Sequence, residues 1–174
     1  MEGPGLRPGG PVSPVYATRR FTFSAAHRYA RPGWSAAENR RHYGGLAAVH
    51  GHNYTLEVTI RGEVDARTGM VMDLAELKRV VAETVLDRFD HAYLNEDPSF
   101  EGGAIPTAEN LVRLIWELLQ PKLGADRLWR LRLWEARGLL RMSHPPLAIA
   151  TYPRPRVVGG LGGGATPLPP KVDQ

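Results

Sequence analysis

The stretch His50-Gly-His-Asn-Tyr-Thr-Leu-Glu-Val-Thr-Ile-Arg61 decides the fold class, because two kinds of residue alternate along it. One phase is polar. The other is mostly apolar and holds His50, His52, Tyr54, Leu56, Val58 and Ile60. Successive side chains of a β-strand point to opposite faces, so this alternation predicts a strand with one face in the core.

Three further segments complete a predicted sheet. Val15 to His27 places Phe21, Phe23, Ala25 and His27 on one face, and Arg127 to Ala136 and Leu147 to Tyr152 supply two more strands. Residues 28–49 carry prolines and glycines and are expected to form a long loop. A loop of more than about 15 residues in a compact domain is usually functional.

Two helices are predicted between the second and third strands. Asp73 begins the first as its N-cap, with Glu76 in capping-box position. Its buried stripe is expected at Leu74, Leu77, Val81 and Val85. Thr107 caps the second helix, whose inward residues are Leu111, Leu114, Ile115 and Leu118, and Pro121 and Gly124 mark its end. The order β-β-α-α-β-β predicts an α+β fold, a four-stranded antiparallel sheet with both helices on one face.

Composition sets the boundaries of the domain and excludes several classes of protein. A chain of 174 residues suits one domain, here residues 15–152, between proline- and glycine-rich tails at 1–14 and 153–174. We find no secretory signal, no apolar run of the roughly 20 residues that span a bilayer and no basic run mixed with aromatics. The expected location is therefore the cytoplasm, without membrane or nucleic-acid partners.

The charge and the cysteine count bear on the chemistry. The net charge is +4, and only three of the 22 basic residues are lysines. Such a surface is ordinarily just solvated, but arginine also suits a substrate that bears a triphosphate. The chain has no cysteine, which excludes disulfides, zinc–thiolate sites and a thiol nucleophile.

Three histidines form a candidate metal site. His50 and His52 point to the same side of their strand, and Gly51 between them lets the backbone approach a ligand closely. His27 ends the neighbouring strand in its apolar phase. A His-x-His pair alone is more often a surface or satisfied core pair. A third histidine at the end of a second strand favours a catalytic zinc site, which commonly has three protein ligands.

Five ordered motifs carry a resemblance to a known family. They are Phe21-Thr-Phe-Ser-Ala-Ala-His27, His50-Gly-His-Asn-Tyr54, Gly69-Met-Val-Met-Asp-Leu-Ala-Glu-Leu-Lys78, Leu86-Asp-Arg-Phe-Asp-His-Ala-Tyr-Leu-Asn95 and Pro106-Thr-Ala-Glu-Asn-Leu111. In this order they resemble the 6-pyruvoyl-tetrahydropterin synthase / 6-carboxy-tetrahydropterin synthase family over residues 15–152. The resemblance implies the tunnelling fold, in which the sheets of several subunits join into barrels. It also implies a homohexamer, a dimer of trimers, with active sites between subunits and a small pterin as substrate.

The resemblance also implies roles for individual residues. His27, His50 and His52 match the zinc ligands, and Asp90 and His91 match a catalytic pair, although a helix-end charge pair is the alternative. Glu135 matches the glutamate that anchors the pterin ring, since one carboxylate accepts two adjacent N–H groups. A salt bridge with an arginine is the other interpretation of Glu135. Thr107 and Glu109 match a further part of the pterin-binding segment, which is compatible with Thr107 also capping a helix.

The chain departs from the family at its catalytic base. The family's cysteine would fall near Gly44 or Leu46, and neither side chain accepts a proton. The nearest ionisable residues are Glu38, His42 and Tyr43, of which His42 has the most suitable reference pKa, unless all three are ordinary loop residues.

Three functions stay open on the sequence. The first is a zinc-dependent lyase acting on 7,8-dihydroneopterin triphosphate or a related dihydropterin. The second is a pterin-binding paralogue without synthase activity, and the third is an aldolase-type enzyme that cleaves a dihydropterin side chain. Tetrahydrobiopterin, queuosine and folate pathways are all compatible with the motifs.

Overall fold

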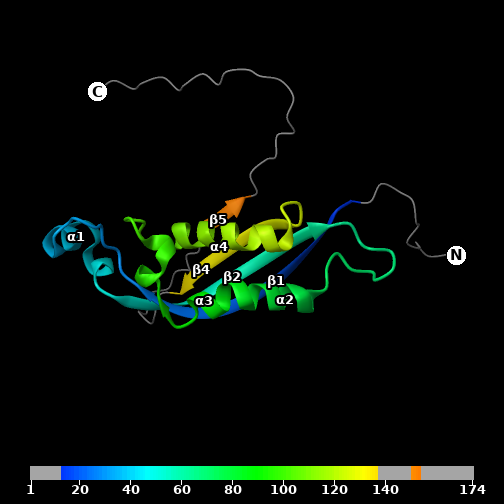
Figure 1. The fold of residues 1–174 in the computed structure, drawn as a ribbon, viewed down its shortest axis with the longest axis horizontal. Coiled ribbons are helices and arrows are strands. Elements are labelled where there is room, and N and C mark those ends of the chain that lie inside the picture. Colours follow the sequence, from blue (N-terminus) through cyan, green and yellow to red (C-terminus); the bar gives the residue numbers. More distant parts are fainter. Residues whose placement is uncertain (1–12, 137–149, 154–174) are drawn as a thin grey trace, which may run out of the picture.

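A sheet with β2 (His50–Gly62) at its centre organises the molecule, and the computed structural model describes residues 13–136 and 150–153 of it (Figure 1). β1 (Val15–His27) pairs antiparallel with β2 from Val15 opposite Gly62 to His27 opposite His50. β4 (Leu128–Ala136) pairs with the other edge of β2, and β5 (Ala150–Pro153) pairs with β4, both antiparallel. The four predicted strands are therefore present, although residues 147–149 lie outside the described part.

The prediction of a purely antiparallel, four-stranded sheet was wrong. A two-residue strand, β3 (Ala92–Tyr93), runs parallel to β1, so the sheet is mixed and has the order β3-β1-β2-β4-β5. A backbone hydrogen bond holds the chain just before β3 against β1, because the His91 N–H donates to the Ser24 carbonyl. So short a strand has no periodicity that would reveal it in the sequence.

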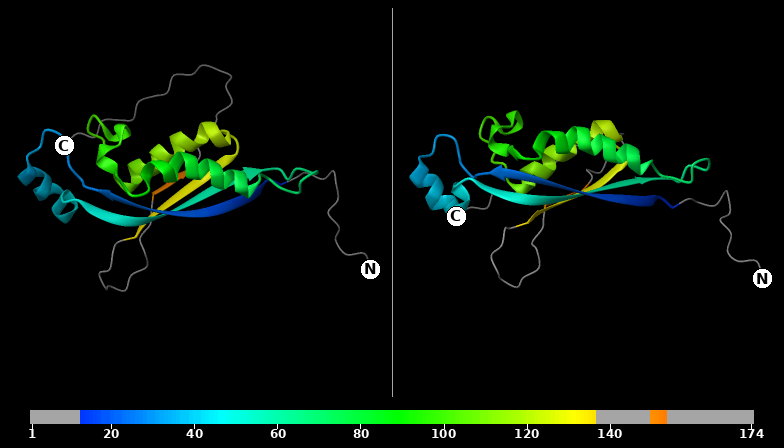
Figure 2. Two further views of the ribbon diagram at one scale, coloured as in Figure 1. Left: turned by 60° about the horizontal axis from the view of Figure 1, so that its bottom comes forward. Right: turned by 90° about the horizontal axis from the view of Figure 1, so that it is seen from below.

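One helical layer covers one face of the sheet (Figure 2). Its first part is a continuous run of α2 (Leu74–Val81), a π-helical turn (Ala82–Leu86) and α3 (Asp87–Phe89). Asp73 caps this run as predicted, but its side chain accepts from the Ala75 N–H instead of the Glu76 N–H of a capping box. Leu77, Val81 and Val85 are buried as expected, whereas Leu74 is 41% exposed. Val80 is buried as well.

The second part of the layer is α4 (Ala108–Leu123). Thr107 is its N-cap and Gly124, with φ of 88°, follows its last residue. Pro121 lies inside the last turn, and Leu114 and Leu118 are only partly buried. Leu111 and Ile115 are buried as expected. They are joined by Ala108, Val112, Trp116, Leu119 and Leu123. These side chains lie in the same core as Tyr54, Leu56, Val58 and Ile60 of β2, each fully buried.

Residues 28–49 are not the plain loop that we expected. They contain α1 (Ala36–Tyr43) and a 3-10 turn (Gly44–Ala47). Ser35 and Glu38 form a reciprocal capping box that starts α1. The helix buries only Asn39, so it has no apolar stripe that would mark it in the sequence.

Two more 3-10 turns, η3 (Leu94–Glu96) and η4 (Pro98–Phe100), precede α4.

Most of both predicted tails lies outside the described residues. Across the described ranges, no helix combines the length and the apolar character needed to cross a membrane.

Candidate metal and substrate site

The three predicted histidines meet at one end of the sheet. His27 lies directly opposite His50, and His52 lies opposite Ala25, so the strand register itself brings the rings together. Ring centroids are 4.6 Å apart for His27 and His50, 5.0 Å for His27 and His52, and 4.9 Å for His50 and His52. One nitrogen from each ring lies within 4.8 Å of the other two.

Backbone carbonyls orient two of the rings. His27 Nδ1 lies 2.7 Å from the Pro106 oxygen, and His50 Nδ1 lies 2.8 Å from the Ala48 oxygen. A carbonyl accepts only, so each Nδ1 carries the proton and each Nε2 keeps its lone pair. Both Nε2 atoms are buried and have no hydrogen-bond partner among the described residues. Imidazoles held in this way are typical metal ligands, and this donor set fits a small divalent cation such as zinc.

Glu135 of β4 reaches the same point from the neighbouring strand. Its Oε1 lies 3.2 Å from His27 Nε2 and 3.3 Å from His52 Nε2, and it accepts a 3.0 Å hydrogen bond from the Tyr54 hydroxyl. Burial opposes ionisation, but the nearby His27 and His52 rings and the Tyr54 donor together hold the pKa of Glu135 below its usual value. Burial, more than the adjacent Glu135 charge, raises the pKa of Tyr54, so the phenol remains a donor.

Asp90 and His91 form a pair at the β1 edge. Asp90 Oδ1 accepts from the Ser24 N–H at 2.8 Å and lies 3.1 Å from His91 Nδ1. The Ser24 N–H, and to a lesser degree the charge of His91, lower the pKa of Asp90. His91 has a φ of 59°, uncommon for a residue with a side chain, and its side chain is 83% exposed. The pair is thus ordered by Ser24 and faces solvent in the single chain.

The predicted pterin-binding segment begins beside His27. Pro106, whose carbonyl orients His27, directly precedes Thr107. The Thr107 hydroxyl accepts from the Asn110 N–H at 3.2 Å, so its role as helix cap is confirmed. Glu109 lies exposed in the first turn of α4.

The three candidates for a replacement base, Glu38, His42 and Tyr43, all lie on α1. Glu38 is held by Ser35, whose side-chain and backbone hydrogen bonds lower the pKa of Glu38. His42 is exposed and stacks on Trp34, with ring centroids 4.6 Å apart. The Tyr43 ring packs edge-on against Tyr29 at 5.9 Å.

Two aromatic residues of this site were not predicted. Tyr29 contacts His27 edge-on, with ring centroids 5.3 Å apart, and its N–H donates to the Leu46 carbonyl at 2.8 Å. Tyr54 stacks on Phe23 and donates to Glu135. The sequence does signal Tyr54, which follows His52 in the same phase of β2. It carries no signal for Tyr29, which lies beyond the end of the strand.

Comparison with known proteins agrees with this geometry. The family model described as 6-pyruvoyl tetrahydropterin synthase matches residues 16–140. The 6-pyruvoyl tetrahydrobiopterin synthase of Drosophila melanogaster is 36% identical over 149 residues, which cover 84% of each chain. The Homo sapiens protein of that name is 36% identical over 129 residues, 73% of this chain and 89% of the relative.

Solved structures lead to the same family. The 6-pyruvoyl tetrahydropterin synthase of Caenorhabditis elegans superposes with a TM-score of 0.67 at 33% identity, covering 82% of this chain and 96% of the other. Because the family model spans most of the chain and the relatives align along most of their length, this chain belongs to the 6-pyruvoyl tetrahydropterin synthase family.

Proposed function

We propose that the chain is a zinc-dependent lyase that acts on 7,8-dihydroneopterin triphosphate or a related dihydropterin. The observation that carries the proposal is the convergence of three histidines and the Glu135 carboxylate at one end of the sheet. One small molecule can therefore contact both a metal ion held by the histidines and the Glu135 carboxylate, which accepts hydrogen bonds from a polar ring.

In this proposal His27, His50 and His52 hold the zinc ion. When bound, zinc supplies Lewis acidity that polarises the hydroxyl groups of the substrate side chain. The protein contributes the orientation of its ligands, because the Pro106 and Ala48 carbonyls fix two of the rings before any ligand arrives. Such carbonyl partners typically raise the affinity of a metal site.

Glu135 anchors the pterin ring. A pterin presents an amine and a ring N–H side by side, and an ionised carboxylate accepts both in two roughly parallel bonds. The Tyr54 donor supports the ionised form and restricts the rotation of the carboxylate. Thr107 and Glu109 complete the binding segment, next to the carbonyl that positions His27.

Asp90 and His91 act as the acid–base pair that transfers a proton to or from the substrate. The Asp90 carboxylate accepts from His91 Nδ1, which leaves His91 Nε2 as the group that takes or returns a proton. His91 is largely exposed in the single chain. Membership of the family leads us to propose a homohexamer, a dimer of trimers, in which the exposed His91 meets substrate at a subunit interface. His42 is the proposed replacement for the absent thiol.

A pterin-binding paralogue is the second candidate, and one observation favours it. Leu46 occupies a position expected for the family's cysteine, while Glu38 is engaged in its capping box and His42 is stacked on Trp34. If no other group supplies the base, ligand binding persists without turnover.

Product analysis separates these candidates. Zinc-loaded protein is incubated with 7,8-dihydroneopterin triphosphate, and released triphosphate and acetaldehyde are measured. We expect release of triphosphate. Tight pterin binding without product over hours would leave the binding function, and aldehyde formed from unphosphorylated dihydroneopterin would indicate the aldolase-type activity.

A further inference from the structure

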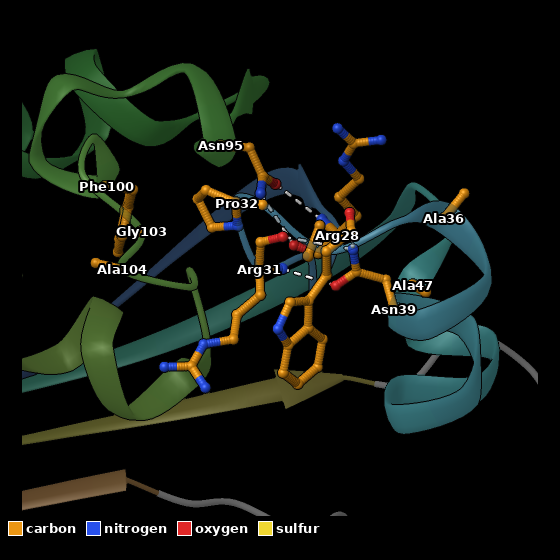
Figure 3. A pocket seen from close by; sticks show the side chains of 13 residues that line it. Arg28, Arg31, Pro32, Ala36, Asn39, Ala47, Asn95, Phe100, Gly103 and Ala104 are labelled. Atoms are coloured by element: carbon orange, nitrogen blue, oxygen red, sulfur yellow. Dashed lines mark hydrogen bonds between the residues drawn. The ribbon is translucent and has the colours of Figure 1, made fainter.

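A cavity, distinct from the histidine cluster, opens between two loops near the same end of the sheet (Figure 3). Its volume is about 540 Å³. One wall comes from residues 28–39, with Ala47, and the other from Asn95, Phe100, Gly103 and Ala104. In the described chain the lining contains two arginines, Arg28 and Arg31, and no carboxylate.

Two asparagines fix the backbone of both arginines without using their guanidinium groups. Asn95 accepts from the Arg28 N–H at 2.8 Å and donates to the Arg28 carbonyl at 3.0 Å. Asn39, which is 7% exposed, accepts from the Arg31 N–H at 2.7 Å and donates to the Trp34 carbonyl at 3.2 Å. Figure 3 shows Asn95 and Asn39 making these bonds on two sides of the loop, with Arg31 extending between the walls.

The guanidinium groups themselves are available to an anion. Within residues 13–136 and 150–153, four arginines form ion pairs with carboxylates, and Arg28 and Arg31 are not among them. The Arg31 guanidinium carbon lies 5.4 Å from the centre of the Trp34 ring, a contact that orients the cation at little cost to its charge. Two cations on a held backbone, with no acid to neutralise them, suit the oxygens of a phosphate chain.

The cavity adjoins the metal centre through the chain itself. Arg28 directly follows His27. Ala47, in one wall, precedes the residue whose carbonyl orients His50, and Ala104, in the other, lies two residues before Pro106. A molecule whose reacting carbons lie at the histidines therefore has this cavity within reach of an extended tail.

We propose that this cavity binds the oligophosphate tail of the substrate, with Arg31 as the main contact and Arg28 at the rim. The proposal rests on the proposed function, since it divides one substrate between two sites: the ring at Glu135 and the phosphates between the loops. It assigns specificity for a phosphorylated over an unphosphorylated dihydropterin to these two arginines.

Calorimetry with inorganic tripolyphosphate tests the cavity without any chemical turnover. The variants are Arg31→Gln and Arg28→Gln, and the control is Arg113→Gln, an equal loss of charge on an exposed position of α4. Loss of a charged hydrogen bond predicts roughly 10- to 100-fold weaker tripolyphosphate binding for Arg31→Gln and a smaller loss for Arg28→Gln. The control should change affinity by less than about twofold, since a single exposed charge acts weakly through solvent.

Unphosphorylated dihydroneopterin separates this proposal from the proposed function. Its affinity should be the same in the wild type and in both cavity variants, whose folding is checked by thermal melting. Equal tripolyphosphate binding in Arg31→Gln and Arg113→Gln, or an equal loss of dihydroneopterin binding, would overturn the cavity assignment. Tripolyphosphate binding that depends on Arg31, in a protein that binds no pterin, would instead remove the proposed function and leave the anion site.

Discussion

Replacing Glu135 with glutamine distinguishes a pterin anchor from a fourth metal ligand. Both roles are geometrically open, because Oε1 lies 3.2 Å from His27 Nε2 and 3.3 Å from His52 Nε2 while it also accepts from the Tyr54 hydroxyl. Glutamine has nearly the same shape. It keeps one acceptor oxygen, which the Tyr54 hydroxyl still satisfies, and exchanges the other oxygen for a donor.

The expected loss follows from the number of donors that the variant leaves unsatisfied. The pterin presents two adjacent N–H groups, and the glutamine amide accepts at most one of them and opposes the other with its own N–H. Losing a hydrogen bond to an ionised acceptor costs about 1.5–3 kcal/mol, or roughly 10- to 150-fold in the dissociation constant. Zinc affinity should change little, because the three imidazoles and the two carbonyls that orient His27 and His50 are untouched.

Two titrations of the same protein measure these effects. Dihydroneopterin is titrated into zinc-loaded protein by fluorescence, and zinc is titrated against a chelating dye. Glu57→Gln is the matched control, since it removes the same charge from β2, where Glu57 pairs with Arg20 and Arg132. A large fall in zinc affinity with unchanged pterin binding in Glu135→Gln would refute the anchor and make Glu135 a metal ligand.

Three further changes test other parts of the structure. His50→Ala should lower bound zinc measured by elemental analysis, and full zinc content would contradict the metal site. His91→Asn should keep the melting temperature, because asparagine tolerates a φ of 59°, but lower turnover roughly 10²- to 10⁴-fold; unchanged turnover would exclude His91 from proton transfer. Asp97→Asn removes the charge and one of the two acceptors in the 2.6 and 2.7 Å bonds from Arg88, which lower the pKa of Asp97. The stability from a lowered carboxyl pKa is present above roughly pH 3.9 and is lost as pH falls through the folded-state pKa. In urea unfolding, the wild type should therefore exceed Asp97→Asn in free energy of unfolding by about 1–3 kcal/mol at pH 7, and the difference should shrink below roughly pH 3.9. A difference that stays the same at pH 7 and below roughly pH 3.9 would contradict the ion-pair account.

The long strands could be predicted because their burial follows a simple period. Tyr54, Leu56, Val58 and Ile60 alternate with polar residues, and each is fully buried. The helix α1 could not be found in this way, because its only buried residue is Asn39. A sequence signal did exist in Ser35-Ala-Ala-Glu38, which forms the capping box, but a cap without an apolar stripe does not distinguish a helix from a turn.

The site was predictable where a residue type carries the chemistry. His27, His50 and His52 converge as their strand positions indicated, because alternation places all three on one face of the sheet. The register that sets His27 opposite His50 is visible only in the structure. The position of Asp90 and His91 was not predictable, since it depends on the backbone of Ser24, and backbone N–H and carbonyl groups are the same in almost every residue.

The proposed metal centre depends on the loops as well as on the strands that carry its three histidines. The strands bring the three rings together, but the carbonyls that select the tautomers of His27 and His50 belong to Pro106 and Ala48, both in connecting segments. These segments are themselves ordered by side chains, as the Asn110 amide donates to the Ile105 carbonyl and the Tyr29 N–H donates to the Leu46 carbonyl. Since the same segments also line the arginine cavity, order at the metal and order at the cavity have a common origin. We therefore expect a substitution in residues 44–48, where the family's cysteine would fall, to change metal affinity through the Ala48 carbonyl and His50, even though it removes no proposed ligand.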